Sequence, residues 1–249
     1  LREHEMSVQA QREEDVDSSP PGKLLLAMET RVWAELAHYA LARRTLAREL
    51  PRGDGSAVLI VPGFGADDFA TRPLRRALRE LGYAAHGWGQ KRNLGMRPGL
   101  REALNLKLYS LQRDHGKVTL IGWSLGGVFV REMARHQPEC VRRVITLGSP
   151  INGHPNANNM LPLFKLANRG KPMKLDWEGF QRRRNPPPVP CTAIYSKSDG
   201  IVAWRCSREE ELPNTENIEV SGSHFGLCAN PKVIRVIADR LARDSARTS

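Results

Sequence analysis

The 249-residue sequence has no apolar run long enough to cross a membrane. A spanning helix needs roughly 20 consecutive apolar residues, whereas the apolar stretch 24–28 is followed at once by charged residues. Residues 1–22 are rich in charge and contain no apolar core of a signal peptide. We therefore expect a flexible N-terminal tail at 1–22 and a cytoplasmic protein with no transmembrane segment.

Cysteine is scarce, and its spacing does not match a metal site. The four cysteines are Cys140, Cys191, Cys206 and Cys228. None of them lies in a C-x-x-C or cysteine–histidine metal-binding pattern. Free thiols are the first expectation, and a disulfide between Cys206 and Cys228 is the alternative.

Acidic residues are outnumbered, because 38 Lys and Arg against 27 Asp and Glu give a net charge of +11. Such an excess is typical of proteins that bind nucleic acid or an anionic lipid surface. Here the basic residues are spread over several predicted helices, and only 182–184 form a run of arginines. We expect no nucleic-acid partner, and peripheral contact with anionic lipid stays open.

From residue 57 onward, short apolar runs alternate with amphipathic stretches, with no internal repeat. The apolar run 57–61 predicts a strand buried on both faces. Further strands are predicted at 83–88, 118–121, 141–147, 192–195 and 217–220. The stretches between them have helical spacing, as does 23–50, which we expect to be a packing helix or helix pair. This order predicts an α/β domain at 23–249 with six parallel strands flanked by helices.

The strongest chemical signal is Gly-Trp-Ser-Leu-Gly at 122–126. It matches Gly-x-Ser-x-Gly, in which a strand turns abruptly into a helix with a strained serine at the apex. The flanking glycines remove the Cβ atoms that would collide in such a turn. Because an apolar strand precedes the motif and a helical pattern follows, Ser124 is the candidate nucleophile.

A serine hydroxyl needs a base to remove its proton, and the base needs an acid to orient it. His224 follows the last predicted strand, at the sheet edge where parallel α/β folds place their catalytic groups. It is the candidate base, with His154 in reserve. Asp199 follows the preceding strand and is the candidate acid. An unremarkable turn aspartate beside Gly200 is the alternative for Asp199.

Negative charge on the substrate carbonyl oxygen would need two backbone N–H donors. One is expected from Leu125, directly after the nucleophile and at a helix N-terminus. The other is expected from Phe64, in the glycine-rich loop after the first strand.

Residues 151–189 interrupt the strand–helix alternation and are rich in Asn, Pro, Gly and Arg. We interpret them as a cap-like insertion over the site rather than a second domain. Together with residues near the catalytic segments, they predict an acyl pocket. The candidate lining residues are Trp123, Phe164, Trp177, Trp204 and Phe225. Ordinary core packing is the alternative for this set.

With these motifs in place, residues 55–245 resemble the α/β-hydrolase superfamily and, within it, the lipases and esterases. The resemblance rests on the segments 61–65, 122–127, 146–150, 198–200 and 223–224. It implies a compact α/β-hydrolase fold, a Ser-His-Asp triad, an acyl-enzyme intermediate and no cofactor or metal. Two departures stand out: many lipases carry His-Gly where this chain has Pro62-Gly63, and the helix at 23–50 replaces the first two strands.

The sequence favours a serine carboxylic-ester hydrolase, an esterase or lipase acting on a small-molecule ester with an apolar acyl chain. An acyltransferase or thioesterase with the same triad is the first alternative. A catalytically silent basic binding module is the second, and the intact Ser, His and Asp argue against it.

Overall fold

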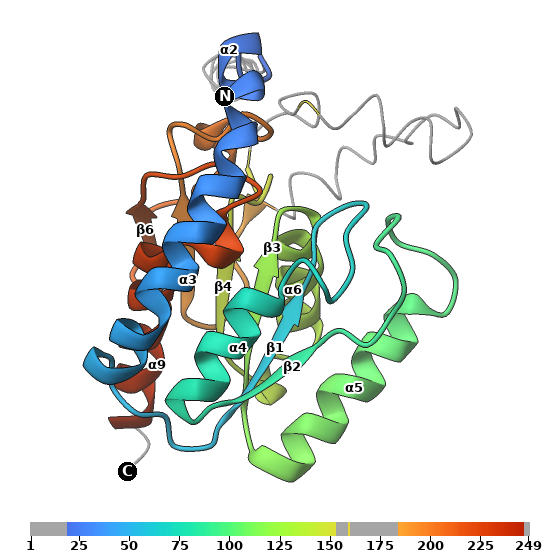
Figure 1. Cartoon of the computed structure of the whole chain (residues 1–249). Coiled ribbons are helices and arrows are strands. Elements are labelled where there is room, and N and C mark those ends of the chain that lie inside the picture. Colours follow the sequence, from blue (N-terminus) through green and yellow to red (C-terminus); the bar gives the residue numbers. More distant parts are fainter. Residues whose placement is uncertain (1–18, 153–158, 160–183, 247–249) are drawn as a thin grey trace, which may run out of the picture.

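The computed structural model describes residues 19–152, 159 and 184–246, and within them six strands form one parallel sheet (Figure 1). The strand order is β2-β1-β3-β4-β5-β6, and every neighbouring pair is parallel. The strands are β1 (Ala57–Val61), β2 (Ala84–Gly87), β3 (Val118–Trp123), β4 (Val141–Leu147), β5 (Cys191–Tyr195) and β6 (Thr215–Glu219). The predicted six-stranded parallel sheet is confirmed.

Helices cover both faces of the sheet. One face carries α3 (Val32–Glu49), α4 (Arg72–Leu81) and α9 (Pro231–Ala246), and the other carries α5 (Leu100–His115) and α6 (Leu125–His136). The short helices are α2 (Lys23–Ala27), η1 (Met28–Arg31), η2 (Pro138–Cys140), η3 (Trp204–Ser207) and η4 (Leu227–Ala229). Alternate residues of β1 enter opposite cores, because side chains along a strand point to alternating faces.

The N-terminal segment forms α2, η1 and α3, as its apolar spacing predicted. Tyr39 and Leu46 of α3 are buried, and the Tyr39 hydroxyl donates to the Pro73 carbonyl at 2.8 Å. The strand arrows point toward the end of the molecule where α2 lies (Figure 1). The segment therefore reaches from the carboxyl edge of the sheet down along α4 and α9. None of the helices in the described part of the chain is both long and apolar enough to cross a membrane.

The last strand begins and ends earlier than predicted, at Thr215 and Glu219 rather than at 217 and 220. The difference has a physical reason. β6 is an edge strand and is only half-buried, so polar residues occupy positions that would be apolar in a central strand.

All four cysteines are buried and none is in a disulfide, so the alternative of a Cys206–Cys228 disulfide is wrong. Burial raises the pKa of the Cys228 thiol to about 12. A thiol with such a pKa is protonated at neutral pH and therefore unreactive. The cysteines belong to the packed interior and not to the chemistry.

The two ends of the predicted insertion meet at a buried arginine. Arg131 of α6 donates to the carbonyl of Ile151 at 3.4 Å and to those of Arg184 and Asn185 at 3.1 and 3.3 Å. Its charge is balanced by Glu209 at 2.7 Å, and both side chains are almost fully buried. Most of the predicted cap, 151–189, lies outside the described residues, as does most of the predicted tail at 1–22.

We expect Glu209→Leu to lower the free energy of unfolding by about 3–5 kcal/mol, because it leaves the Arg131 charge buried without its partner. Denaturant unfolding measures the change. Asp114→Asn is the matched control, because the Arg113–Asp114 pair is exposed and water screens its attraction. Equal effects of the two substitutions would contradict a stabilising role for the buried pair.

Candidate active site

Ser124 sits at an abrupt turn between β3 and α6. Its φ is 53° and its ψ is −125°, and among the described residues no other non-glycine residue has a positive φ. Such a backbone is strained for a residue with a side chain. Both glycines of the motif lie where no side chain fits. A Cβ atom on Gly126 would collide with the Val61 carbonyl, and one on Gly122 would collide with the backbone of Gly127. The turn predicted from the Gly-x-Ser-x-Gly motif is confirmed.

Asp199 and His224 lie against each other after adjacent strands. Nδ1 of His224 is 2.6 Å from Oδ2 of Asp199, and the two residues are 2% and 3% exposed. The other carboxylate oxygen, Oδ1, accepts the N–H groups of Ile201 and Val202, both at 2.8 Å. The carboxylate is thus fixed from two sides. A proton on Nδ1 leaves Nε2 of the imidazole as the nitrogen that can act as a base.

The Asp199–His224 pair adjoins the strand end that carries Ser124. The ring of Trp123, the residue before the serine, lies 5.6 Å from the His224 ring, and its Nε1 donates to the His224 carbonyl at 3.1 Å. A Cβ atom on Gly148, after β4, would lie 2.9 Å from Oδ2 of Asp199 and 3.1 Å from Nδ1 of His224. Among the described residues, the hydrogen bonds of Ser124 are made by its backbone.

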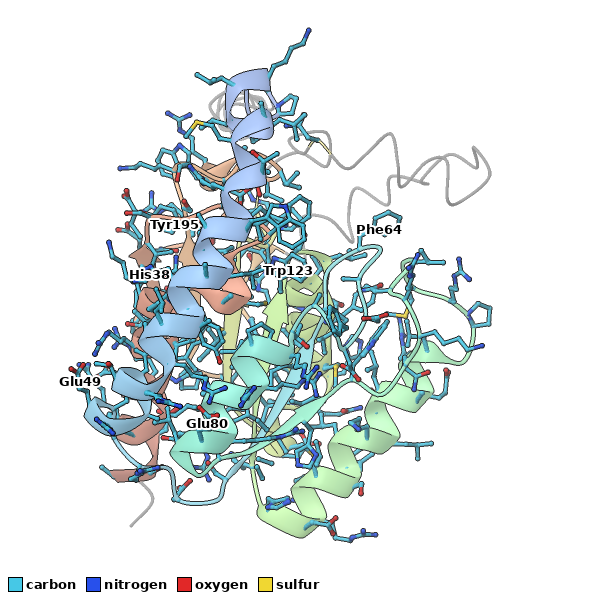
Figure 2. All side chains as sticks on the ribbon, in the orientation of Figure 1. His38, Glu49, Phe64, Glu80, Trp123 and Tyr195 are labelled. Carbon is cyan, nitrogen blue, oxygen red and sulfur yellow. The ribbon has the colours of Figure 1, made fainter. Side chains whose placement is uncertain are left out.

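The loop after β1 packs directly on the serine. A Cβ atom on Gly63 would lie 2.9 Å from Cβ of Ser124, so only glycine allows this approach. Phe64 follows in the same loop, and Leu125 is the first residue of α6, where backbone N–H groups have no partner within the helix. Figure 2 shows Phe64 and Trp123 toward the end of the molecule to which the strand arrows point.

Asn93 shapes this loop and was not identified from the sequence. It is fully buried, and its side-chain amide donates to the Pro62 carbonyl at 2.8 Å. Its backbone N–H donates to the Ala66 carbonyl at 2.8 Å, and its carbonyl accepts the Gly65 N–H at 2.7 Å. Asn93 lies in a polar loop and has no apolar or motif context, so the sequence offered no signal for it.

The predicted pocket residues separate into three groups. Trp123 and Phe225 adjoin His224, and their rings lie 6.3 Å apart in an edge-on arrangement. Trp204 instead stacks on Tyr195 at 5.7 Å, under the cation of Arg205. Phe164 and Trp177 lie outside the described residues, as does the reserve base His154.

The sequence analysis also missed Glu29, whose carboxylate contacts the loops that carry Asp199 and His224. Its backbone partners are Gly200, His224 and Phe225. A signal was present, since Glu29 falls on the same helical stripe as Leu25, Val32 and Leu36. A charged residue on an apolar stripe indicates a buried polar contact.

No protein-family model and no curated protein matches the sequence. Solved structures match over most of the chain. A monoacylglycerol lipase from Paleococcus ferrophilus has a TM-score of 0.56 at 17% identity, covering 78% of this chain and 97% of its own. The pyrethroid hydrolase PytH has a TM-score of 0.54 at 17% identity, and the match covers 75% of this chain and 97% of PytH. The thioesterase domain of the curacin biosynthetic pathway has a TM-score of 0.51 at 14% identity, and the match covers 78% of this chain and 93% of that domain.

The fold is that of the α/β-hydrolases. At these identities the likeness establishes the fold alone. Within the α/β-hydrolase fold, the described site combines a strained serine after β3, a carboxylate–imidazole pair after β5 and β6, and a glycine-rich loop after β1. These are the parts that acyl transfer to a serine requires.

We expect Gly63→Ala to slow the reaction of Ser124 with a fluorophosphonate by about tenfold or more, because the new methyl group displaces the loop or the serine. The labelling rate is measured by intact-protein mass spectrometry. Gly22→Ala is the control, because a Cβ atom there meets open space. An unchanged rate for Gly63→Ala would show that the loop does not constrain the serine.

Proposed function

We propose that this protein is a serine hydrolase of carboxylic esters. Ser124 is the nucleophile, His224 is the general base and then the general acid, and Asp199 orients the imidazole and stabilises its cation. The backbone N–H groups of Leu125 and Phe64 bind the developing oxyanion.

The observation that carries the proposal is the buried hydrogen bond of 2.6 Å between Asp199 and His224. A buried imidazole could be satisfied by a single backbone carbonyl. Here it meets a carboxylate that two backbone N–H groups fix in place. Its ring also packs on the residue that precedes the strained serine. An imidazole oriented in this way can accept a proton and be stabilised as a cation.

Acylation uses the three side chains and the two N–H groups together. Nε2 of His224 takes the hydroxyl proton as Oγ of Ser124 attacks the ester carbonyl carbon, and the carbonyl oxygen becomes negative. The imidazolium is stabilised by Asp199, and the oxyanion by the two N–H groups. The tetrahedral intermediate collapses when His224 returns the proton to the leaving alkoxide, which releases the alcohol and leaves the acyl group on Ser124.

Deacylation repeats the sequence with water. His224 takes a proton from water as the water oxygen attacks the acyl carbon, and it then protonates Oγ of Ser124 as the acid departs. The serine and the imidazole are restored, so one ester and one water give one acid and one alcohol.

We also propose an ester with an apolar acyl chain as the substrate. Phe225 is 43% exposed and its ring is 5.8 Å from the His224 ring, so an apolar surface adjoins the imidazole. Fold neighbours named as a monoacylglycerol lipase and as a thioesterase domain support acyl chemistry at such a site.

We expect Ser124→Ala to lower kcat by roughly 10⁴-fold or more on p-nitrophenyl esters, because it removes the nucleophile. The series runs from acetate to palmitate, and its optimum distinguishes an esterase from a lipase. Ser110→Ala is the control, because Ser110 is an exposed serine on α5.

The same assay separates the alternatives. Product analysis that finds the acyl group on added alcohols or thiols rather than on water would identify an acyltransferase, and a preference for thioesters would identify a thioesterase. A wild type that is inactive on every ester, or a Ser124→Ala variant that keeps its activity, would overturn the proposal. Salt-dependent retention of an inactive protein on a polyanion column would favour the basic binding module.

A further inference from the structure

The N-terminal segment reaches both catalytic loops through one buried carboxylate. Glu29 of η1 is 5% exposed. Its Oε1 accepts the N–H groups of Gly200 at 2.8 Å and His224 at 2.9 Å, and its Oε2 accepts that of Phe225 at 3.1 Å. A single side chain thus connects the residue after the proposed acid to the proposed base itself.

Two neighbouring residues contact the same loops. Nη2 of Arg31 donates to the carbonyl of Ser198, the residue before Asp199, at 2.5 Å. Glu35 accepts the N–H of Ser223 at 2.8 Å and also its hydroxyl. The residues on both sides of the acid and of the base are therefore bonded to the N-terminal segment.

Two glycines of these loops lie tightly against the N-terminal segment. A Cβ atom on Gly200 would collide with the carbonyl oxygen of Leu25, and one on Gly226 would collide with the Glu35 carboxylate. A residue larger than glycine at position 200 would push the loop away from the backbone of α2, and one at position 226 would displace the Glu35 carboxylate. The N-terminal segment is therefore closely packed against both loops.

A carboxylate suits this position because each contact from the loops to Glu29 is an N–H donor. Buried N–H groups without an acceptor are costly, and hydrogen bonds to a charged acceptor are roughly twice as strong as neutral ones. Glutamine would keep one acceptor oxygen but would turn an NH₂ group toward a donor. The negative charge at residue 29 is thus matched to the three donors.

We propose that Glu29 is a positioning residue for the catalytic pair. It holds the Asp199 loop and the His224 loop at the separation that allows the hydrogen bond of 2.6 Å between them. This inference rests on the proposed function. Glu29 contacts backbone only at these loops, so its loss acts on the alignment of the imidazole and not on substrate binding.

We expect Glu29→Gln to lower kcat by about tenfold, and Glu29→Ala by about 10²-fold, with KM near the wild-type value. Ester hydrolysis under saturating and limiting substrate separates the two constants. Glu49→Gln is the matched control, because Glu49 lies at the opposite end of α3 and pairs with Arg235 at 2.7 Å (Figure 2). Thermal unfolding of all three variants reports whether the fold is retained.

A second readout follows the catalytic pair directly. The proton in the Asp199–His224 hydrogen bond should give a low-field NMR resonance in the wild type, and Glu29→Gln should shift or broaden it. A kcat equal to that of Glu49→Gln would overturn the inference. A lower melting temperature and kcat with an unchanged resonance would also overturn it, since the role would then be structural only.

The two proposals fail in different ways. If the wild type hydrolyses esters through Ser124 but Glu29→Gln behaves like the control, only the positioning role is wrong. If the wild type hydrolyses no ester, the proposed function fails. The resonance of the His224 proton still decides whether Glu29 aligns the pair.

Discussion

The backbone of Ser124 is the constraint around which the rest of the molecule is arranged. A positive φ at a residue with a side chain costs about 1–3 kcal/mol, so the surrounding packing has to impose it. β3 supplies the incoming strand, with β1 and β4 on either side. The close approach of α6 to the Val61 carbonyl supplies the outgoing direction. Three neighbouring strands and one helix thus impose the strained backbone of Ser124.

The loops that carry Asp199 and His224 need support from outside the sheet. Loops after β5 and β6 present backbone N–H groups toward the N-terminal segment, and buried donors require acceptors. Glu29 and Glu35 provide them. The helix at 23–50, which the sequence suggested was only a packing element, therefore contributes polar contacts as well as apolar area. In this six-stranded sheet, the N-terminal segment supplies the hydrogen-bond acceptors that the strands do not provide to these loops.

The sequence predicted the fold and the serine turn because both depend on local sequence patterns. An apolar run such as 57–61 indicates a buried strand, and Gly-x-Ser-x-Gly indicates the turn, without reference to distant residues. Asp199 and His224 could be chosen because each follows a strand at the same edge of the sheet. Asn93 and the bonding role of Glu29 depend on partners far away in the chain, so local patterns could not assign them. The predicted bounds of the edge strand β6 were wrong for a related reason, since its half-buried residues lack the apolar run of a central strand.

The hydrogen bond from His224 to Glu29 spans 195 residues of chain. Closing so long a loop is slower than forming a local helix, because its ends must first meet. The serine turn can be complete while the loop that carries His224 is still unattached. A chain whose N-terminal segment has not yet docked would then hold the serine turn without the Glu29 contact to the loop that carries His224.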